Sequence, residues 1–257
     1  MNIADQMTIG VSIIIPCFNE ADRITPTVQA IVEYFRRGST PLELIFVDDG
    51  STDSTKAVIQ QLCECTVNPA GFQSRLFSLE PNRGKGAAIK EGFLAASREV
   101  VLLCDADLSC PIEEVAKFMP HISSYPIVIG SRRCMGAQVA IPQARYRMLM
   151  GRVYSWLSRT LLRVDVTDFT CGFKMFQRGA AVRLASLLTI NRWAYDSELL
   201  KIATIHHMPI KEVPVLWRND ERSRVSLPKD TMASFRDLIR IVLNTWLGRY
   251  GTDGRQP

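Results

Sequence analysis

Short apolar runs recur along the first half of the chain, and longer amphipathic segments separate them. The first run, VSIIIP at residues 11–16, is rich in β-branched residues and almost continuously apolar, which is typical of a strand buried on both faces of a parallel sheet. Similar runs at residues 42–47, 75–79, 99–104 and 126–130 predict further strands. Their alternation with helices favours an α/β fold with a doubly wound, mostly parallel sheet flanked by helices. Ligands bind such sheets at the carboxyl ends of the strands.

Helical spacing of apolar residues predicts the helices that connect these strands. They are expected at residues 21–37, around residues 58–62 behind a cap at Ser51 or Thr52, at residues 85–97 and from Pro111 onward. In the second half, helices are expected at residues 145–162, 178–188 and 195–207, and strands at residues 171–176 and 210–215. We find no repeat and no linker, so the second half is expected to extend the same domain.

One large domain is the expected organisation, because 47% hydrophobic residues in a chain of 257 are enough for a substantial core. We expect it to span residues 1–228, with a nucleotide-binding half at 1–130 and an acceptor half at 131–228. Residues 229–257 are expected to form a C-terminal amphipathic helix and tail. The apolar stripe of this helix has Arg flanks and a Trp, which fits a membrane interface, but general amphipathicity favours docking on the core. The stripe is expected to comprise Phe235, Leu238, Ile239, Val242 and Trp246.

Basic residues are unevenly distributed within the modest net charge of +5. The segment from Ser131 to Val164 holds seven arginines and neither Asp nor Glu. Such a segment indicates an anionic partner, which can be a nucleic acid, a lipid headgroup or a nucleotide diphosphate, unless it is simply a solvated helix face. Nucleic acid is the least favoured of these partners, because aromatic residues are sparse over the segment and no nucleic-acid motif accompanies it.

The cysteine content and the hydropathy pattern indicate where in the cell the protein is expected. Seven cysteines are an odd number, and Cys17 and Cys104 lie in or beside apolar runs where they act as small hydrophobic residues, so we expect a reduced, cytoplasmic environment. The N-terminus has no signal-peptide pattern, and no apolar run approaches the roughly 18 residues of a spanning helix. We expect peripheral contact at the cytoplasmic face of a membrane, without a transmembrane segment.

The strongest chemical signal is the sequence Asp105-Ala106-Asp107, directly after the apolar run that ends at Cys104. In an extended segment, residues two apart point to the same side, so both carboxylates can face one point in a cleft. Two such oxygen ligands suit Mg²⁺ or Mn²⁺, which would also take diphosphate oxygens and water. The metal would then neutralise a departing nucleotide diphosphate.

Polar residues also follow the first two predicted strands. Pro16, Asn19 and Glu20 come after the first, where Asn19 and Glu20 can reach a nucleotide. Asp48 and Asp49 come after the second, and the glycine that follows them allows a tight turn. An ordinary turn followed by a helix cap explains this second group equally well.

A fourth signal lies at the predicted helix start at residues 82–88, NRGKGAA. Small residues let the backbone approach a ligand closely, a helix N-terminus favours anions, and Lys85 adds a charge. The spacing is not that of a P-loop, and no G-x-G-x-x-G follows the first strand, so a dinucleotide-binding fold is not expected.

Together these signals resemble the large inverting family 2 of nucleotide-sugar transferases, which has the GT-A fold. The resemblance rests on P-x-x-N-E at residues 16–20, V-D-D-G-S-T-D at residues 47–53 and D-A-D-L at residues 105–108. Segments of the second half are similar to the dolichyl-phosphate β-glucosyltransferases and dolichyl-phosphate mannose synthases. They lie at residues 130–132, 168–176, 192–198 and 212–217.

The resemblance implies roles for individual residues. Asp105 and Asp107 are expected to hold the metal, with Ala106 between them in the nucleotide-sugar site, and Glu20 and Asp48 to hold the nucleotide. Pro16, Asn19, Asp49 and Lys85 complete the expected nucleotide-sugar site. The arginines expected to face the diphosphate and the acceptor phosphate are Arg132, Arg145, Arg147, Arg222 and Arg224. Asp105, Asp107, Arg132 and Asp196 are the expected catalytic residues.

The implied reaction is transfer of a hexose from a nucleotide diphosphate sugar to a polyprenyl phosphate with inversion. UDP-glucose is favoured over GDP-mannose by similarity alone. An ionised lipid phosphate needs no strong general base, whereas a hydroxyl acceptor needs one, for which Asp196 or Glu198 is available. The alternatives are therefore a soluble transferase acting on a sugar or protein hydroxyl, and a non-catalytic module that binds a nucleotide sugar or an anionic lipid.

Overall fold

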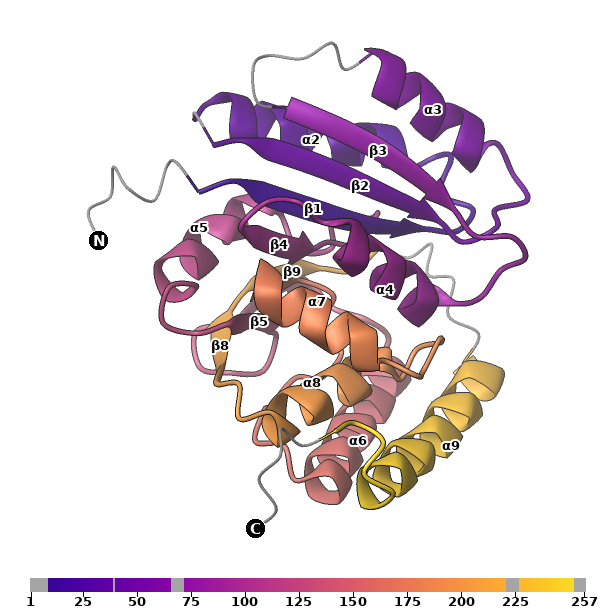
Figure 1. Ribbon diagram of the computed structural model, residues 1–257, viewed down its shortest axis with the longest axis vertical. Helices are drawn as coiled ribbons and strands as arrows, with labels where there is room; N and C mark the ends of the chain where they lie inside the picture. The colour runs from indigo at the N-terminus through magenta and orange to yellow at the C-terminus, as the bar shows by residue number, and fades with distance from the viewer. Residues whose placement is uncertain (1–8, 39, 66–71, 221–226, 252–257) are drawn as a thin grey trace.

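A seven-stranded sheet in the order β3-β2-β1-β4-β7-β5-β8 forms the centre of the protein, as seen in a computed structural model (Figure 1). The structure describes residues 9–38, 40–65, 72–220 and 227–251. The strands of the sheet are β1 (Val11–Cys17), β2 (Leu42–Asp48), β3 (Phe72–Ser78), β4 (Val100–Leu103), β5 (Ile127–Ser131), β7 (Lys174–Gln177) and β8 (Ile210–Pro214). All except β7 pair in parallel, so the expected doubly wound, mostly parallel sheet is confirmed.

The order of the strands reverses at β1, because β2 and β3 lie on one side of it and β4 lies on the other. In a sheet of this kind, the carboxyl ends of the two strands at the reversal border a crevice in which ligands bind. The segment after β1 begins at Phe18, and the segment after β4 contains Asp105 and Asp107. The topology therefore brings two of the expected site segments to the same crevice.

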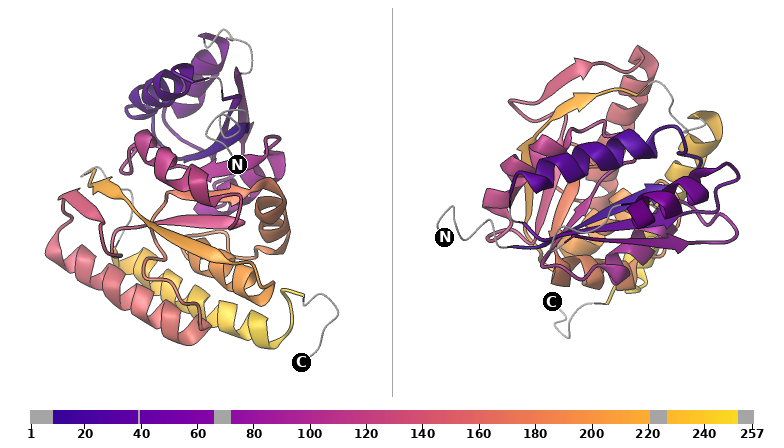
Figure 2. Two further views of the ribbon diagram at one scale, coloured as in Figure 1. Left: turned by 90° about the vertical axis from the view of Figure 1, so that its left-hand side faces the viewer. Right: turned by 90° about the horizontal axis from the view of Figure 1, so that it is seen from above.

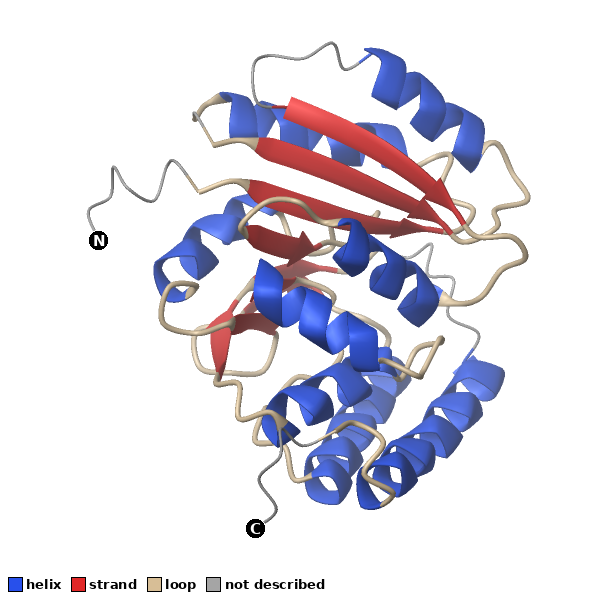
Figure 3. Ribbon diagram, viewed as in Figure 1, coloured by secondary structure: helices blue, strands red, loops and turns tan. Residues whose placement is uncertain are grey.

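Helices cover both faces of the sheet (Figure 3). On one face, Ile13 and Ile15 of β1 belong to a core that also contains residues of α2 (Ile24–Arg36) and α5 (Val115–Phe118). On the other face, Ile14 belongs to a core shared with α4 (Lys85–Ala95), α7 (Arg178–Leu187) and α8 (Tyr195–Ile205). All three isoleucines are fully buried. The continuous apolar character of the strand is explained by burial of its alternate side chains on opposite faces.

The last two long helices, α6 (Arg145–Leu162) and α9 (Leu227–Trp246), lie side by side at the edge of the molecule (Figure 2). The rings of Tyr154 and Phe235 meet between them, with centroids 6.0 Å apart. Helix α9 packs against the core through Leu238 and Ile241, which are buried, so the expectation that it docks on the protein is confirmed. Among the described residues, no helix has the length and apolarity needed to cross a membrane.

Some local expectations are wrong. Neither Ser51 nor Thr52 caps helix α3 (Thr55–Cys65), because the helix begins later and Asp53 accepts a hydrogen bond from the Thr55 amide. The helix expected from Pro111 is broken into α5 and the short 3₁₀ turns η1 (Ile112–Glu114) and η2 (Met119–His121). The strand expected from residue 171 begins only at Lys174. A parallel pair, β6 (Gln138–Ile141) and β9 (Leu216–Arg218), was not expected, because β6 is exposed throughout and lacks a core-facing pattern.

Candidate active site

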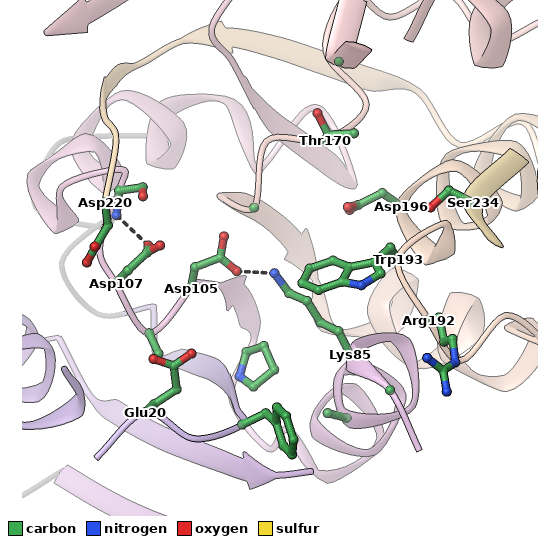
Figure 4. A pocket seen from close by; sticks show the side chains of 18 of the residues that line it. Glu20, Lys85, Asp105, Asp107, Thr170, Arg192, Trp193, Asp196, Asp220 and Ser234 are labelled. Carbon is green, nitrogen blue, oxygen red and sulfur yellow. Dashed lines mark hydrogen bonds and ion pairs between the residues drawn. The ribbon is translucent and has the colours of Figure 1, made fainter. Parts of the chain in front are cut away.

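A cavity of about 520 Å³ lies at the carboxyl ends of β1 and β4, which is a volume typical of small-molecule sites. Its walls come from the segments after β1, β2 and β4, the start of α4, and the turn before β7. Helices α6 and α9, the start of α8 and the end of β9 complete it. Residues far apart in the sequence therefore meet around one space, as Figure 4 shows.

Asp105 and Asp107 enter this cavity directly after β4, as the sequence pattern predicts. The amide of Ser109 donates a hydrogen bond of 2.9 Å to Oδ1 of Asp107, which fixes one carboxylate oxygen. Burial and then the charge of Asp105 raise the pKa of Asp107. The two carboxylates are thus close enough to repel each other, which a bound cation would relieve.

Lys85 lies between the carboxylate pair and the wall of the cavity. Its Nζ atom is 2.6 Å from Oδ1 of Asp105 and 5.5 Å from the centre of the Trp193 ring. Burial alone would lower the pKa of Lys85, but the Asp105 carboxylate raises it. Burial likewise acts to raise the pKa of Asp105, but Lys85 lowers it. Both groups are therefore charged at neutral pH, as ligand binding by either requires.

Gly172 makes room for the Asp105 carboxylate on the opposite side. A Cβ atom at this position would collide with the carboxylate oxygens of Asp105. Gly172 belongs to the turn between Asp168 and β7, so this turn sets the space in which Asp105 can lie. The glycine is required here for close approach rather than for an unusual backbone angle.

The residues present fit a divalent cation of the Mg²⁺ or Mn²⁺ type. Two half-buried carboxylates two residues apart supply hard oxygen ligands, and the glycine opposite Asp105 leaves room for one of them. No group of three or more His, Cys, Asp or Glu side chains able to hold a metal is found among the described residues. A donor set limited to two carboxylates leaves positions for diphosphate oxygens and water, as is usual for Mg²⁺ in phosphate sites.

The wall expected to bind the nucleotide is built from the segments after β1 and β2. Pro16 and Glu20 line the cavity, and Glu20 is paired with the buried Arg23, whose Nη2 atom is 2.5 Å from Oε2 of Glu20. Arg23 also lies 3.6 Å from Asp220 at the end of the described segment. Arg23 therefore joins the loop after β1 to the loop after β9 across the cavity.

Asp49 lines the cavity while it also organises the loop before α4. Its two carboxylate oxygens accept hydrogen bonds of 2.7 Å from the amides of Arg83 and Gly84. Burial raises the pKa of Asp49, and these two hydrogen bonds act against that rise. Asp49 therefore has a structural role, because it fixes the loop before α4.

Three of the expected binding residues lie outside the lining of the cavity: Asn19, Asp48 and Arg145. Oδ1 of Asn19 accepts a hydrogen bond of 2.8 Å from the Thr52 amide, and Asp48 accepts one of 2.5 Å from the Ser51 hydroxyl. The Asn19 contact holds the segments after β1 and β2 together, and the Asp48 contact shapes the turn after β2. Arg145 is exposed at the start of α6. Their roles in binding stay predictions, as do those of Arg222 and Arg224, which lie outside the described residues.

Arg132 reaches the cavity but is tightly held by Asp168. Its Nε and Nη2 atoms donate hydrogen bonds of 2.7 and 2.8 Å to the two carboxylate oxygens of Asp168, which is fully buried. Burial alone would raise the pKa of Asp168, but the guanidinium holds it well below its usual range. Arg147 also lines the cavity, from α6. Arg132 therefore presents a charge of fixed position, and Asp168 determines where that charge lies.

Asp196 lines the cavity opposite Asp105 and is paired with the buried Lys174. Burial raises the pKa of Asp196, and Lys174 opposes the rise. Glu198, two residues on, has a different role. It is fully buried, does not line the cavity and accepts hydrogen bonds from Thr189, Ile190 and Tyr250, so it fixes the loop before α8.

Sequence reasoning missed two of the buried charged residues that organise the site, Lys174 and Arg23. For Lys174 a signal was present, because a lysine inside the apolar run FKMF cannot be buried on both faces without an acidic partner. For Arg23 no signal was available, since its position at the start of an amphipathic helix is ordinary for an exposed arginine. From the sequence alone, Trp193 has no expected role beyond its place in the family-like segment at residues 192–198. In the structure its ring lies near Lys85.

Comparison with known proteins identifies the family. A model of the family described as glycosyl transferase family 2 matches residues 12–184. The chain belongs to glycosyl transferase family 2. It is 31% identical to human dolichyl-phosphate beta-glucosyltransferase over 97% of this chain and 80% of that protein. The enzyme of the same name from Saccharomyces cerevisiae is 28% identical over 96% of this chain and 78% of that protein.

The fold of the family 2 chain also matches solved structures. One is glucosyl-3-phosphoglycerate synthase from Mycobacterium tuberculosis in complex with Mn²⁺, UDP-glucose and phosphoglyceric acid. It has a TM-score of 0.66 and 21% identity, covering 96% of this chain and 82% of that one. The similarity confirms the expected GT-A fold. As a member of family 2, the chain is a glycosyltransferase, and its cavity at the carboxyl ends of β1 and β4 is the candidate active site.

Proposed function

We propose that this glycosyltransferase moves a hexose, with glucose favoured over mannose, from a nucleotide diphosphate sugar to a polyprenyl phosphate with inversion. Residues 1–130 would bind the nucleotide, and residues 131–228 the acceptor. The proposal rests most on one observation: the cavity joins a carboxylate pair at the end of β4 to a wall formed by α6 and α9. The family 2 relatives named for this reaction support the choice of substrates.

The nucleotide end of the cavity has the chemistry that the donor requires. Asp105 and Asp107 would hold Mg²⁺ or Mn²⁺, and a bound metal ion supplies charge neutralisation for a diphosphate leaving group. Lys85 adds a fixed cation next to Asp105. The Mn²⁺ and UDP-glucose bound by the mycobacterial enzyme support the same assignment.

In the proposed reaction, an oxygen of the acceptor phosphate attacks the anomeric carbon opposite the leaving group. A new bond joins this oxygen to the anomeric carbon, and the bond from that carbon to the nucleotide diphosphate breaks. The diphosphate leaves as an anion facing Lys85 and Arg132. A phosphate monoester with a second pKa of about 6 is mostly ionised at neutral pH, so the attack needs no base. The protein acts mainly by holding the two substrates in line and by balancing charge.

The acceptor side of the cavity differs from the nucleotide side in its charge. Arg147, Gly151 and Tyr154 of α6 and Thr231 and Ser234 of α9 line it. Arg192 adds a second arginine from the loop before α8. This arrangement suits an anionic acceptor headgroup.

A second candidate function is transfer to a hydroxyl group, because Asp196 places a carboxylate in the cavity. Asp196 has a raised pKa, as a general base needs, although its pairing with Lys174 restrains the carboxylate. A mycobacterial relative in fold is bound to phosphoglyceric acid, which carries both a hydroxyl and a phosphate. A non-catalytic binding module is the least favoured alternative, since the carboxylate pair and Lys85 are intact.

The proposal is tested with radiolabelled UDP-glucose and GDP-mannose, each with polyprenyl phosphate in detergent, with Mg²⁺ or Mn²⁺ and with an EDTA control. We expect UDP-glucose to label the extractable lipid and EDTA to abolish the label. Labelling of the lipid from GDP-mannose and not from UDP-glucose would show that the transferred sugar is mannose. Label in a water-soluble product with an added hydroxyl acceptor would favour the second function, and metal-dependent binding of both donors without turnover would favour the binding module.

A further inference from the structure

Large apolar side chains are exposed in an unusual distribution. Of those that the structure describes, all except Phe18 and Leu94 lie between residues 135 and 161 or between residues 232 and 247. These two segments include most of α6 and most of α9, which lie side by side (Figure 2). Single exposed apolar residues need no explanation, but a contiguous group of them marks an interaction site.

Helix α6 presents three kinds of side chain on different sides. Ser155, Ser158 and Leu162 are buried against the protein, and Arg147 and Tyr154 line the cavity. A third side carries the exposed Tyr146, Leu149, Val153 and Trp156, which recur at helical spacing. Trp156 is 64% exposed. The apolar side is therefore distinct from the one that packs on the core.

Helix α9 repeats this arrangement. Its buried side includes Leu238 and Ile241. Its exposed apolar residues, Met232, Ile239, Leu243 and Trp246, are spaced seven, four and three residues apart and so lie in one stripe along the helix. Trp246 is 81% exposed, which is costly in water for the largest apolar side chain. Docking on the core thus explains only one side of this helix.

Arginines border both apolar stripes. Arg145 and Arg152 are exposed on α6, and Arg236 and Arg240 are exposed on α9. Among the described side chains of the two helices, residues 145–162 and 231–246, the only acidic one is Asp237, which is buried. The exposed Asp165, just after α6, is paired with Arg159. A surface of this kind has a positive potential next to apolar and aromatic side chains.

We propose that these exposed residues form one docking surface for an anionic lipid bilayer, here called the α6–α9 surface. It comprises Tyr146, Leu149, Val153, Trp156, Met232, Ile239, Leu243 and Trp246 with the four bordering arginines. Apolar stripes with aromatic residues and basic borders are typical of helices that lie in the headgroup layer. A second copy of the chain fits less well, because self-association would bring arginine borders together.

The same two helices line the cavity through Tyr154 and Ser234. A protein docked by the α6–α9 surface therefore has its active site bordering the bilayer. The inference extends the proposed function, since a polyprenyl phosphate is embedded in a membrane. The α6–α9 surface does not depend on the reaction, however, because exposure and charge alone define it.

The test measures binding of the full chain to sedimented vesicles. One set contains phosphatidylcholine alone, and the other contains equal parts of phosphatidylcholine and phosphatidylglycerol. We expect tighter binding to the anionic vesicles, weakened by salt. The Arg236→Gln/Arg240→Gln variant should bind anionic vesicles about five-fold more weakly for each arginine removed. The Trp156→Ser/Trp246→Ser variant should bind both kinds of vesicle at least about ten-fold more weakly.

Matched controls separate the surface from general effects of substitution. Leu94→Ser on α4 and Arg37→Gln after α2 also change exposed residues, but outside the α6–α9 surface, and should bind as the wild type does. Brominated lipids in the vesicles should quench wild-type tryptophan fluorescence, and the quenching should fall in the double tryptophan variant. Circular dichroism checks that each variant is folded.

The proposal is overturned if the wild type binds neither kind of vesicle, or if the control variants lose as much binding as the surface variants. It is also overturned if the double tryptophan substitution converts a self-associated protein into a monomer without any effect on vesicle binding. Transfer to acceptor in detergent is measured in parallel. Vesicle binding without transfer counts against the proposed function alone, and transfer in detergent without vesicle binding counts against the α6–α9 surface alone.

Discussion

Lys174 and Asp196 form a buried ion pair, with Nζ of Lys174 2.6 Å from Oδ1 of Asp196. Lys174 is fully buried and also donates hydrogen bonds to the carbonyl oxygens of Phe169 and Cys171. One side chain therefore joins the turn before β7 to the start of α8. Since Gly172 of this turn lies against Asp105, the pair connects both sides of the cavity.

The first prediction concerns this pair. Lys174→Met should lower the free energy of unfolding by about 3–5 kcal/mol, because it leaves a buried carboxylate and two carbonyl groups without their partner. Chemical denaturation measures the change. Lys56→Met, which removes a half-exposed lysine paired with an exposed glutamate, should cost less than about 1 kcal/mol. Equal losses of unfolding free energy in the two variants would show that the Lys174–Asp196 pair stabilises the fold no more than an exposed ion pair does.

The space beside Asp105 provides a second prediction. Gly172→Ala should lower kcat/KM by about ten- to a hundred-fold, because the added methyl group displaces the Asp105 carboxylate. Gly179→Ala is the matched control: no atom lies within 4 Å of a Cβ placed there, at the start of α7. It should keep full activity and gain about 0.4–1 kcal/mol of stability. Normal kinetics in Gly172→Ala would contradict the role assigned to this contact.

The carboxylate pair provides a third prediction. Asp105→Asn and Asp107→Asn should each lower turnover at least about a hundred-fold while the fold persists, because each loses a charge that would hold the metal. Initial rates measured against Mn²⁺ concentration give the result, with Glu33→Gln as an exposed control. Near-normal activity in either variant would remove the metal assignment.

The carboxyl group of Asp168 should make the free energy of unfolding depend on pH. Its pKa in the folded protein is below its usual value, so the unfolded chain binds the proton more readily. The stabilisation by Arg132 is therefore complete above about pH 4, the ordinary range of an aspartate, and is lost as the pH falls toward the folded pKa. Denaturation at pH 6 and at pH 3 should show a larger loss for the wild type than for Asp168→Asn. An equal loss would mean that other carboxyl groups account for acid sensitivity.

The sequence allowed good prediction where local pattern and tertiary structure agree. The runs at residues 11–16 and 42–47 are strands because their continuous apolar character requires burial on both faces. Asp105 and Asp107 were found because their spacing follows a buried strand. The helix predicted at residues 145–162 has those bounds in the structure.

The rest depends on contacts between distant segments. The pairing of Arg132 with Asp168 and of Lys174 with Asp196 joins residues 36 and 22 positions apart, for which local periodicity carries no information. The cap of α3 was misassigned because Ser51 is engaged by Asp48 and Asn19 instead. For α9, the predicted apolar face combined residues that the fold separates, since Leu238 is buried whereas Ile239 is exposed.

The most direct test of the proposed transfer is chemical analysis of the product formed from UDP-glucose and polyprenyl phosphate. Mass spectrometry and NMR should show a hexose joined to the lipid through a single phosphate, with a β-linkage from the α-linked donor and release of UDP. A lipid diphosphate sugar with release of UMP would contradict attack at the anomeric carbon, and an α-linked product would contradict inversion.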